Sequence, residues 1–167
     1  MQLLAQRVLD DCEIALRLIE NEDDGDTWRV LWAGAVALLR AVGHVLHKVD
    51  AVQHPEMRSR IEYHFRTWKS DDPDHQIFRE FIDQERNSIL KNYASTAHQG
   101  GIIPILLEHF PMKGGADAQQ KFESLEWLSE DIYRPRVHGY RAGDDMRDIY
   151  RDAINWWRTE LSKVIAD

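Results

Sequence analysis

The amino-acid sequence predicts a mainly α-helical protein, an up-and-down bundle of about five helices with a small insertion before the last helix. Apolar residues recur at intervals of three and four residues over most of residues 2–94 and 144–167. Turns rich in Asp, Asn and Pro separate these stretches. The helical period is missing from about Ser95 to Gly143, and this segment is the predicted insertion.

The first two helices are predicted over residues 2–21 and from Thr27 to about Val49. Asp26 or Thr27 is expected to cap the second helix, which is apolar nearly all round and should be the most enclosed. Arg40, His44 and His47 line up on one face of it; a solvent-facing strip is favoured there over a phosphate-facing strip or a two-histidine metal site. The stripe of the first helix consists of Leu4, Val8, Cys12, Ala15 and Ile19.

The third and fourth helices are predicted from Pro55 to Lys69 and from His75 to about Tyr93, on either side of the turn at 70–74. Glu85 falls inside the apolar stripe of the fourth helix. A carboxylate in that position must find a partner or water, so we expect it in a structural polar network with an arginine, histidine or tyrosine of a neighbouring helix.

The insertion contains a block rich in β-branched residues, 102–110, which is predicted to be a short edge strand. Residues 125–140 fit either its partner strand or one helical face. The last helix is predicted to open at Asp144 and to place Trp156 against the insertion or another subunit. Its core stripe consists of Met146, Ile149, Tyr150, Ala153, Trp157, Leu161 and Val164.

Length and composition predict one cytoplasmic domain spanning residues 1–167. The longest apolar run, from Val30 to Leu39, is short for a membrane span, so no membrane association is expected. The single cysteine, Cys12, indicates a core residue rather than a disulfide. No nucleotide-binding, hydrolase or metal-binding signature is found, and the sequence therefore predicts no cofactor and no metal.

The net charge of −8 excludes a protein whose whole surface grips nucleic acid, because neutralising phosphates requires a basic footprint. A local basic patch is compatible with this charge. Its candidates lie in the third and fourth helices and are Arg58, Arg60, Arg66, Lys69, Arg79, Arg86 and Lys91.

Near the end of the fourth predicted helix, residues 86–93 read Arg-Asn-Ser-Ile-Leu-Lys-Asn-Tyr, which is the pattern R-x4-K-x-Y. It resembles the R-x4-H-x-Y signature of the HEPN superfamily, small helical proteins that include ribonuclease toxins of toxin–antitoxin and anti-phage systems. Lys91 stands where that signature has a histidine, and lysine is a poorer general base at neutral pH. The resemblance covers residues 1–94 and 144–167.

The resemblance implies roles for several residues. Arg86 would bind a phosphate as a fork, with Asn87 beside it as a second phosphate-binding residue. Arg86, Lys91 and Tyr93 would form the catalytic set at a cleft shared by two subunits. If the protein is an enzyme, it would be a metal-independent endoribonuclease. The resemblance also implies a homodimer and an RNA partner.

Two functions therefore stay open. The first is a HEPN-like bacterial protein, associated with RNA or related to toxin–antitoxin and phage-defence systems, with or without catalytic activity. The alternative is a non-enzymatic helical interaction module that binds a protein partner through exposed tryptophans and the insertion.

Overall fold

The computed structural model describes residues 3–97 and 133–166, and the regular secondary structure within these ranges is helical. It confirms a mainly α-helical bundle of about five helices. The elements are α1 (Leu4–Glu20), α2 (Gly25–Val45) continued by a π turn (Leu46–Asp50) and α3 (Ala51–Gln53), α4 (Arg58–Thr67), a π segment (Phe78–Asp83) leading into α5 (Gln84–Asn92), and α7 (Met146–Ala166).

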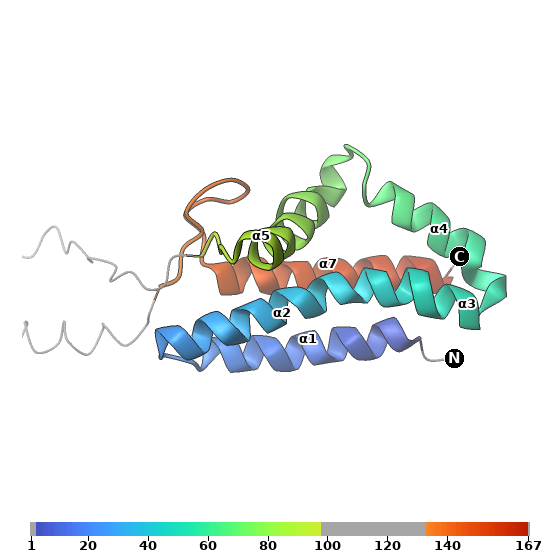
Figure 1. Cartoon of the computed structure of the whole chain (residues 1–167). Coiled ribbons are helices and arrows are strands. Elements are labelled where there is room, and N and C mark those ends of the chain that lie inside the picture. Colours follow the sequence, from blue (N-terminus) through green and yellow to red (C-terminus); the bar gives the residue numbers. More distant parts are fainter. Residues whose placement is uncertain (1–2, 98–132, 167) are drawn as a thin grey trace, which may run out of the picture.

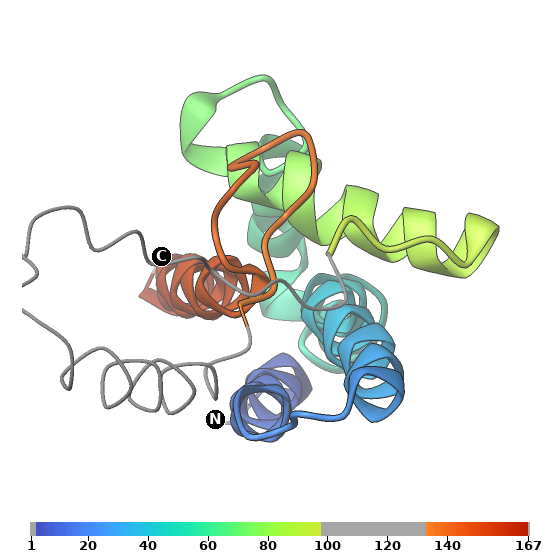
Figure 2. The same cartoon turned by 90° about the vertical axis from the view of Figure 1, so that its left-hand side faces the viewer.

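The helices α1, α2 and α7 lie side by side, while α4 and α5 cover the side of α2 and α7 that faces away from α1 (Figure 1). Figure 2 shows α1, α2 and α7 nearly end-on, with α5 crossing over α2. In the order of the chain, α4 and α5 come between α2 and α7, and these two helices meet at a corner. Asp72 starts the second of these by accepting the N–H of Asp74, and Pro73 follows it in the first turn.

The second predicted helix extends further than expected, since the helical path runs without a break from Gly25 to Gln53. Its N-cap is Asp24, which accepts the N–H of Thr27, rather than Asp26 or Thr27. The expectation that it is the most enclosed helix is wrong: of 21 residues in each helix, α2 buries seven and α7 buries nine. By length and composition alone, the helix Gly25–Gln53 is apolar enough to cross a membrane, as many core helices are.

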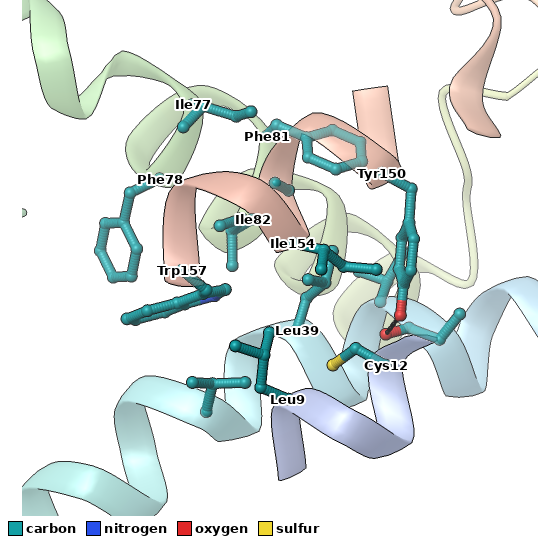
Figure 3. Close-up of a cluster of buried hydrophobic side chains, with 14 of the residues drawn as sticks. Leu9, Cys12, Leu39, Ile77, Phe78, Phe81, Ile82, Tyr150, Ile154 and Trp157 are labelled. Carbon is teal, nitrogen blue, oxygen red and sulfur yellow. Dashed lines mark hydrogen bonds between the residues drawn. The ribbon is translucent and has the colours of Figure 1, made fainter. Parts of the chain in front are cut away.

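Aromatic side chains fill the core between α2, the π segment and α7. Leu39, Phe81 and Ile154 meet there beside Trp157 (Figure 3). Tyr150 donates its hydroxyl to the backbone carbonyl of Ala35 at 3.0 Å. Every residue of the predicted α7 stripe is buried. Close helix approach occurs at Gly43, where an added Cβ would lie 2.6 Å from the Trp157 ring, and not at Gly34, which is exposed.

The face of α1 is rotated relative to the prediction. Leu4 is 41% exposed, whereas Ala5 and Leu9 are buried together with the predicted Cys12 and Ile19. Burial raises the pKa of the Cys12 thiol to about 12, so the thiol is protonated and inert at neutral pH. Cys12 is therefore a core residue, as expected.

Tryptophans do not form an exposed surface in the described part of the chain. Trp28, Trp32, Trp68 and Trp157 are buried. Trp156 is half-buried and packs on His75 and Phe78, donating its indole N–H to the Asp74 carbonyl. The five tryptophans in the described part of the chain therefore provide no exposed binding surface for the alternative function.

The predicted strand 102–110 and the first half of 125–140, residues 125–132, lie outside the described residues. Residues 133–143 form turns, with isolated bridges that join Arg136 to Ala97 and Pro135 to Asp145. Asp145 begins α7 by accepting the N–H of Arg147.

Candidate functional site

The motif of residues 86–93 occupies the last two turns of α5. The helix ends where Tyr93 adopts a left-handed conformation with a φ of 50°, which is uncommon for a large side chain. Its N–H donates to the Ile89 carbonyl, so the cap is closed by backbone hydrogen bonds. As a result Tyr93 points outward and is 75% exposed.

Arg86 belongs to a chain of polar contacts that reaches α2. Its Nη1 donates to Asn87 Oδ1 at 2.8 Å, and the Asn87 amide donates to Asp83 Oδ2 at 3.1 Å. The other oxygen of Asp83 accepts from Arg40 Nε at 2.8 Å. Arg40 is thus paired directly with the Asp83 carboxylate, whereas Arg86 is linked to that carboxylate only through the neutral Asn87 amide.

Arg40 is not part of a freely solvated strip. Its side chain is only 20% exposed and its guanidinium carbon lies 5.6 Å from the centre of the Phe78 ring. His44 is exposed, and His47 is stacked on Phe65 with ring centres 4.3 Å apart. The three residues therefore have separate environments, and the described residues include no group of three side chains suited to a metal ion.

Among the described residues, the predicted phosphate-binding pair is in contact, but the predicted catalytic set of Arg86, Lys91 and Tyr93 is not joined by hydrogen bonds or ion pairs. Arg86 and Asn87 are in contact, whereas Lys91 and Tyr93 are exposed and, within residues 3–97 and 133–166, no hydrogen bond or ion pair joins either of them to Arg86. Lys91 lies on the same final turns of α5 and extends into solvent. Arg86 and Lys91 are therefore positive charges that an anion can bind, but among the described contacts of Arg86 there is no acid–base pair.

A small pocket opens beside Tyr93, between α5 and the first half of α2. It has a volume of about 90 Å³ and is lined by Arg29, Trp32, Ala33, Ile89, Tyr93, Ser95 and Ala97. Arg29 Nε is buried without a hydrogen-bond partner, while its Nη2 pairs with Asp26 at 3.2 Å. This unpaired donor makes the pocket suitable for one small anionic or carbonyl group.

Glu85 is fully buried below this pocket and has four donors. Its carboxylate accepts from Trp32 Nε1 at 3.2 Å and Ser95 Oγ at 2.8 Å, as well as from the backbone N–H and the hydroxyl of Thr96. The expected polar network is present, but its donors are an indole, two hydroxyls and a backbone amide rather than an arginine, histidine or tyrosine. It ties the segment after α5 to α2.

Arg136 lies behind this network and is itself buried. It donates from Nη2 to the Glu80 carbonyl at 2.9 Å and from Nε to the His138 carbonyl at 3.1 Å. Burial lowers the pKa of Arg136, and the nearby Glu85 and Glu80 carboxylates partly offset this effect. The long-range contact with Glu80 attaches residues 134–138 to the π segment before α5.

Two further buried carboxylates were not predicted. Asp50 accepts the first N–H groups of α1, those of Leu4 and Ala5, at 2.9 Å each, so it caps a helix 45 residues away. Glu160 accepts the Trp68 indole N–H at 2.6 Å. Asp50 follows the core residue Leu46 at helical spacing, and Glu160 follows the core residue Trp157 in the same way. The same pattern in the sequence identified Glu85.

Three of the remaining basic candidates are used locally. Arg58 pairs with Glu62, Lys69 lies 4.1 Å from the centre of the Phe65 ring, and Arg79 donates to the carbonyls of Ser70 and Asp72. A hollow of about 730 Å³ at the start of α7 is lined by charges that are paired with one another, including Arg141 with Asp144 and Arg151 with Glu20. The end of α5 is therefore the better candidate site.

No family model matches the chain, and neither a curated protein nor a solved structure matches it at a significant level.

Proposed function

We propose that this is a HEPN-like, RNA-associated protein that binds the phosphate backbone at the end of α5 and does not cleave it. The observation that carries the proposal is the Arg86–Asn87–Asp83–Arg40 chain, in which Asp83 is paired with Arg40 and Arg86 is held by the neutral Asn87 amide. A half-buried, hydrogen-bonded arginine loses less side-chain freedom on binding a phosphate than a freely solvated one.

Lys91 and Tyr93 extend the proposed site. Lys91 is exposed and adds a second uncompensated positive charge, and the exposed Tyr93 ring offers a flat surface on which an unpaired base can stack. The separation of these residues from Arg86 supports binding rather than catalysis, because a reaction at one phosphate needs its acid and base within hydrogen-bond reach.

Binding should be weak and strongly dependent on salt. Two phosphate contacts on a single strand give a slope of log K against log salt concentration of about −1.4, and non-specific affinities of this kind are on the order of 10⁻⁵ M. The acidic surface elsewhere on the protein, with a net charge of −8, opposes any larger footprint.

Fluorescence anisotropy with a labelled single-stranded RNA tests the proposal. We expect binding at low salt, and for Arg86→Ala a loss of about one contact, seen as a slope near −0.7. Arg86→Lys should keep the slope and lose affinity, because lysine keeps the charge without the fork. Arg7→Ala, which removes an exposed arginine of α1, is the matched control and should behave like the natural protein.

Absence of RNA binding even at low salt would reject the proposal, as would an Arg86→Ala variant with unchanged affinity and slope. A non-enzymatic interaction module is the second candidate, since α2 carries an exposed apolar face that the described helices leave uncovered.

A further inference from the structure

The outer face of α2 is apolar although it faces solvent. Val30 is 63% exposed, Gly34 and Ala37 are exposed, and Ala41 is half-buried. These four residues, spaced by four, three and four, lie on one side of the helix and are called the α2 stripe below. On this side, charge is confined to the two ends, at Asp26 and Lys48.

Within residues 3–97 and 133–166, neither the backbone conformation nor the packing of Gly34 requires a glycine. It lies in the middle of a regular helix, where glycine is less favourable than alanine, and a Cβ added to it would meet no atom within 4 Å. The described helices leave the space above it open. A glycine at such a position permits another helix to approach closely from outside.

The apolar surface continues beyond α2. The exposed ring of Tyr93 shares its pocket with Ala33, which lies one turn from both Val30 and Ala37. Leu90, on the same exposed turns of α5, is 59% exposed. Apolar side chains therefore gather on the face formed by α2 and the end of α5, and gathered exposure of this kind is typical of an interaction surface.

The charges at the two ends of the stripe are complementary. Asp26 lies eleven residues before Ala37 and Lys48 lies eleven residues after it. Asp26 is 83% exposed, with Arg29 on one of its oxygens, and Lys48 is exposed. Two copies of α2 packed antiparallel about a two-fold axis at Ala37 would place Asp26 of each copy opposite Lys48 of the other. Parallel packing would place like charges together.

We propose that the α2 stripe is the interface with a second copy of this chain, with α2 packed antiparallel to its counterpart about a two-fold axis at Ala37. The arrangement is isologous, so each contact occurs twice. The small residues at its centre allow close packing, and the charged ends fix the direction. The inference rests on α2 and does not depend on RNA binding by Arg86.

Sedimentation of the natural protein should give a mass about twice 19.6 kDa at micromolar concentration. Ala37→Glu places two carboxylates against each other at the axis and should raise the dissociation constant at least tenfold. Ala166→Glu makes the same change at an exposed position of α7 and should leave the dimer intact. Unchanged helical circular dichroism of Ala37→Glu establishes that the protomer is folded.

Cysteine pairing tests the geometry. Under mild oxidation Ala37→Cys should give a disulfide-linked dimer, because residue 37 faces itself across the axis. Val30→Cys alone should not, whereas Val30→Cys mixed with His44→Cys should, since these positions lie seven residues on either side of Ala37. The natural Cys12 is buried and does not compete.

A strictly monomeric natural protein would overturn the proposal, and so would a dimer that Ala37→Glu leaves intact. Self-pairing of Val30→Cys as strong as that of Ala37→Cys would exclude the antiparallel register. A monomer that co-sediments with vesicles of phosphatidylcholine and phosphatidylglycerol would show that lipid, not a second copy, covers the stripe. Loss of RNA binding with the dimer retained would reject only the proposed function.

Discussion

Three carboxylates, those of Asp50, Glu85 and Glu160, are buried in this bundle, and each accepts hydrogen bonds from groups that are themselves buried or at a helix end. Glu85 and Glu160 each accept an indole N–H, which a purely apolar core could not satisfy. The cost of burying each carboxylate is thus offset by donors that would otherwise lack a partner. These residues fix how neighbouring helices face each other.

Replacing Glu85 by glutamine should destabilise the protein by about 1–3 kcal/mol, because the amide nitrogen cannot accept from the hydroxyls and N–H groups that surround it. Glu56→Gln, at an exposed position, is the control and should change stability by less than about 0.5 kcal/mol. Urea unfolding measures both. Equal stabilities would mean that the donors around Glu85 contribute little.

The natural protein should show no metal-independent cleavage of single-stranded RNA, since Arg86 has no acid–base partner among its contacts and Lys91 extends into solvent. Lys91→His supplies a group that titrates near neutral pH, and we expect it to leave cleavage undetectable because residue 91 faces away from Arg86. A gel assay in chelator measures this. Robust turnover that disappears in Arg86→Ala would contradict the proposal of binding without cleavage.

His47 should make stability fall in mild acid. Burial against Phe65, with Lys48 nearby, lowers the pKa of His47 below its ordinary 6.5, so the folded protein favours the neutral ring. The unfolded chain then binds the extra proton, and stability is lost as pH falls from about 6.5 through the lower folded value. Thermal unfolding of natural protein and His47→Phe between pH 7.5 and 5 should show a smaller fall in Tm for the variant.

At the scale of elements, α2 carries two glycines in its interior, and their surroundings are opposite. Gly43 faces inward, where the Trp157 ring leaves no room for a Cβ, while Gly34 faces outward into open space. The same helix therefore packs closely at one glycine and is left uncovered at the other. Periodicity alone identifies both positions as helical and cannot tell which of them contacts a neighbouring helix.

Gly43→Ala should destabilise the protomer by about 1–2 kcal/mol, since overpacking against a fixed indole outweighs the helical gain. Gly34→Ala should stabilise it by about 0.5–1 kcal/mol, because alanine favours the helix and meets nothing. Denaturant unfolding at submicromolar concentration, where association is weakest, gives both values. A destabilising Gly34→Ala would show that the outer face of α2 is already covered within one chain.

At the scale of the whole molecule, α2 and α7 lie between α1 on one side and the bent pair α4 and α5 on the other (Figure 1). Because α5 packs across α2, the chain of contacts that starts at Arg86 reaches Arg40 of α2. Arg40 lies 43 residues before Asp83, its partner in this chain. The proposed RNA site depends on this crossing. It places the end of α5 beside the α2 stripe, so an RNA site and a subunit interface would be neighbours.

The sequence by itself determined the helices and much of the core, because apolar spacing and helix-ending residues act locally. It located α7 with its whole buried stripe, the turn at 70–74, and Glu85 as a buried carboxylate that needs donors. The donors come from another helix and from the segment after α5, so Trp32, Ser95 and Thr96 could not be predicted from the spacing around Glu85.

Only the tertiary structure decided which face of each helix is covered. Adjacent apolar residues such as Val8 and Leu9 give α1 two equally good registers, and packing against α2 and α7 selected the one that leaves Leu4 in solvent. Likewise, an all-apolar α2 predicts burial on every side, but a bundle of this size has neighbours for only part of it. The uncovered part is a property of packing geometry, which no local pattern encodes.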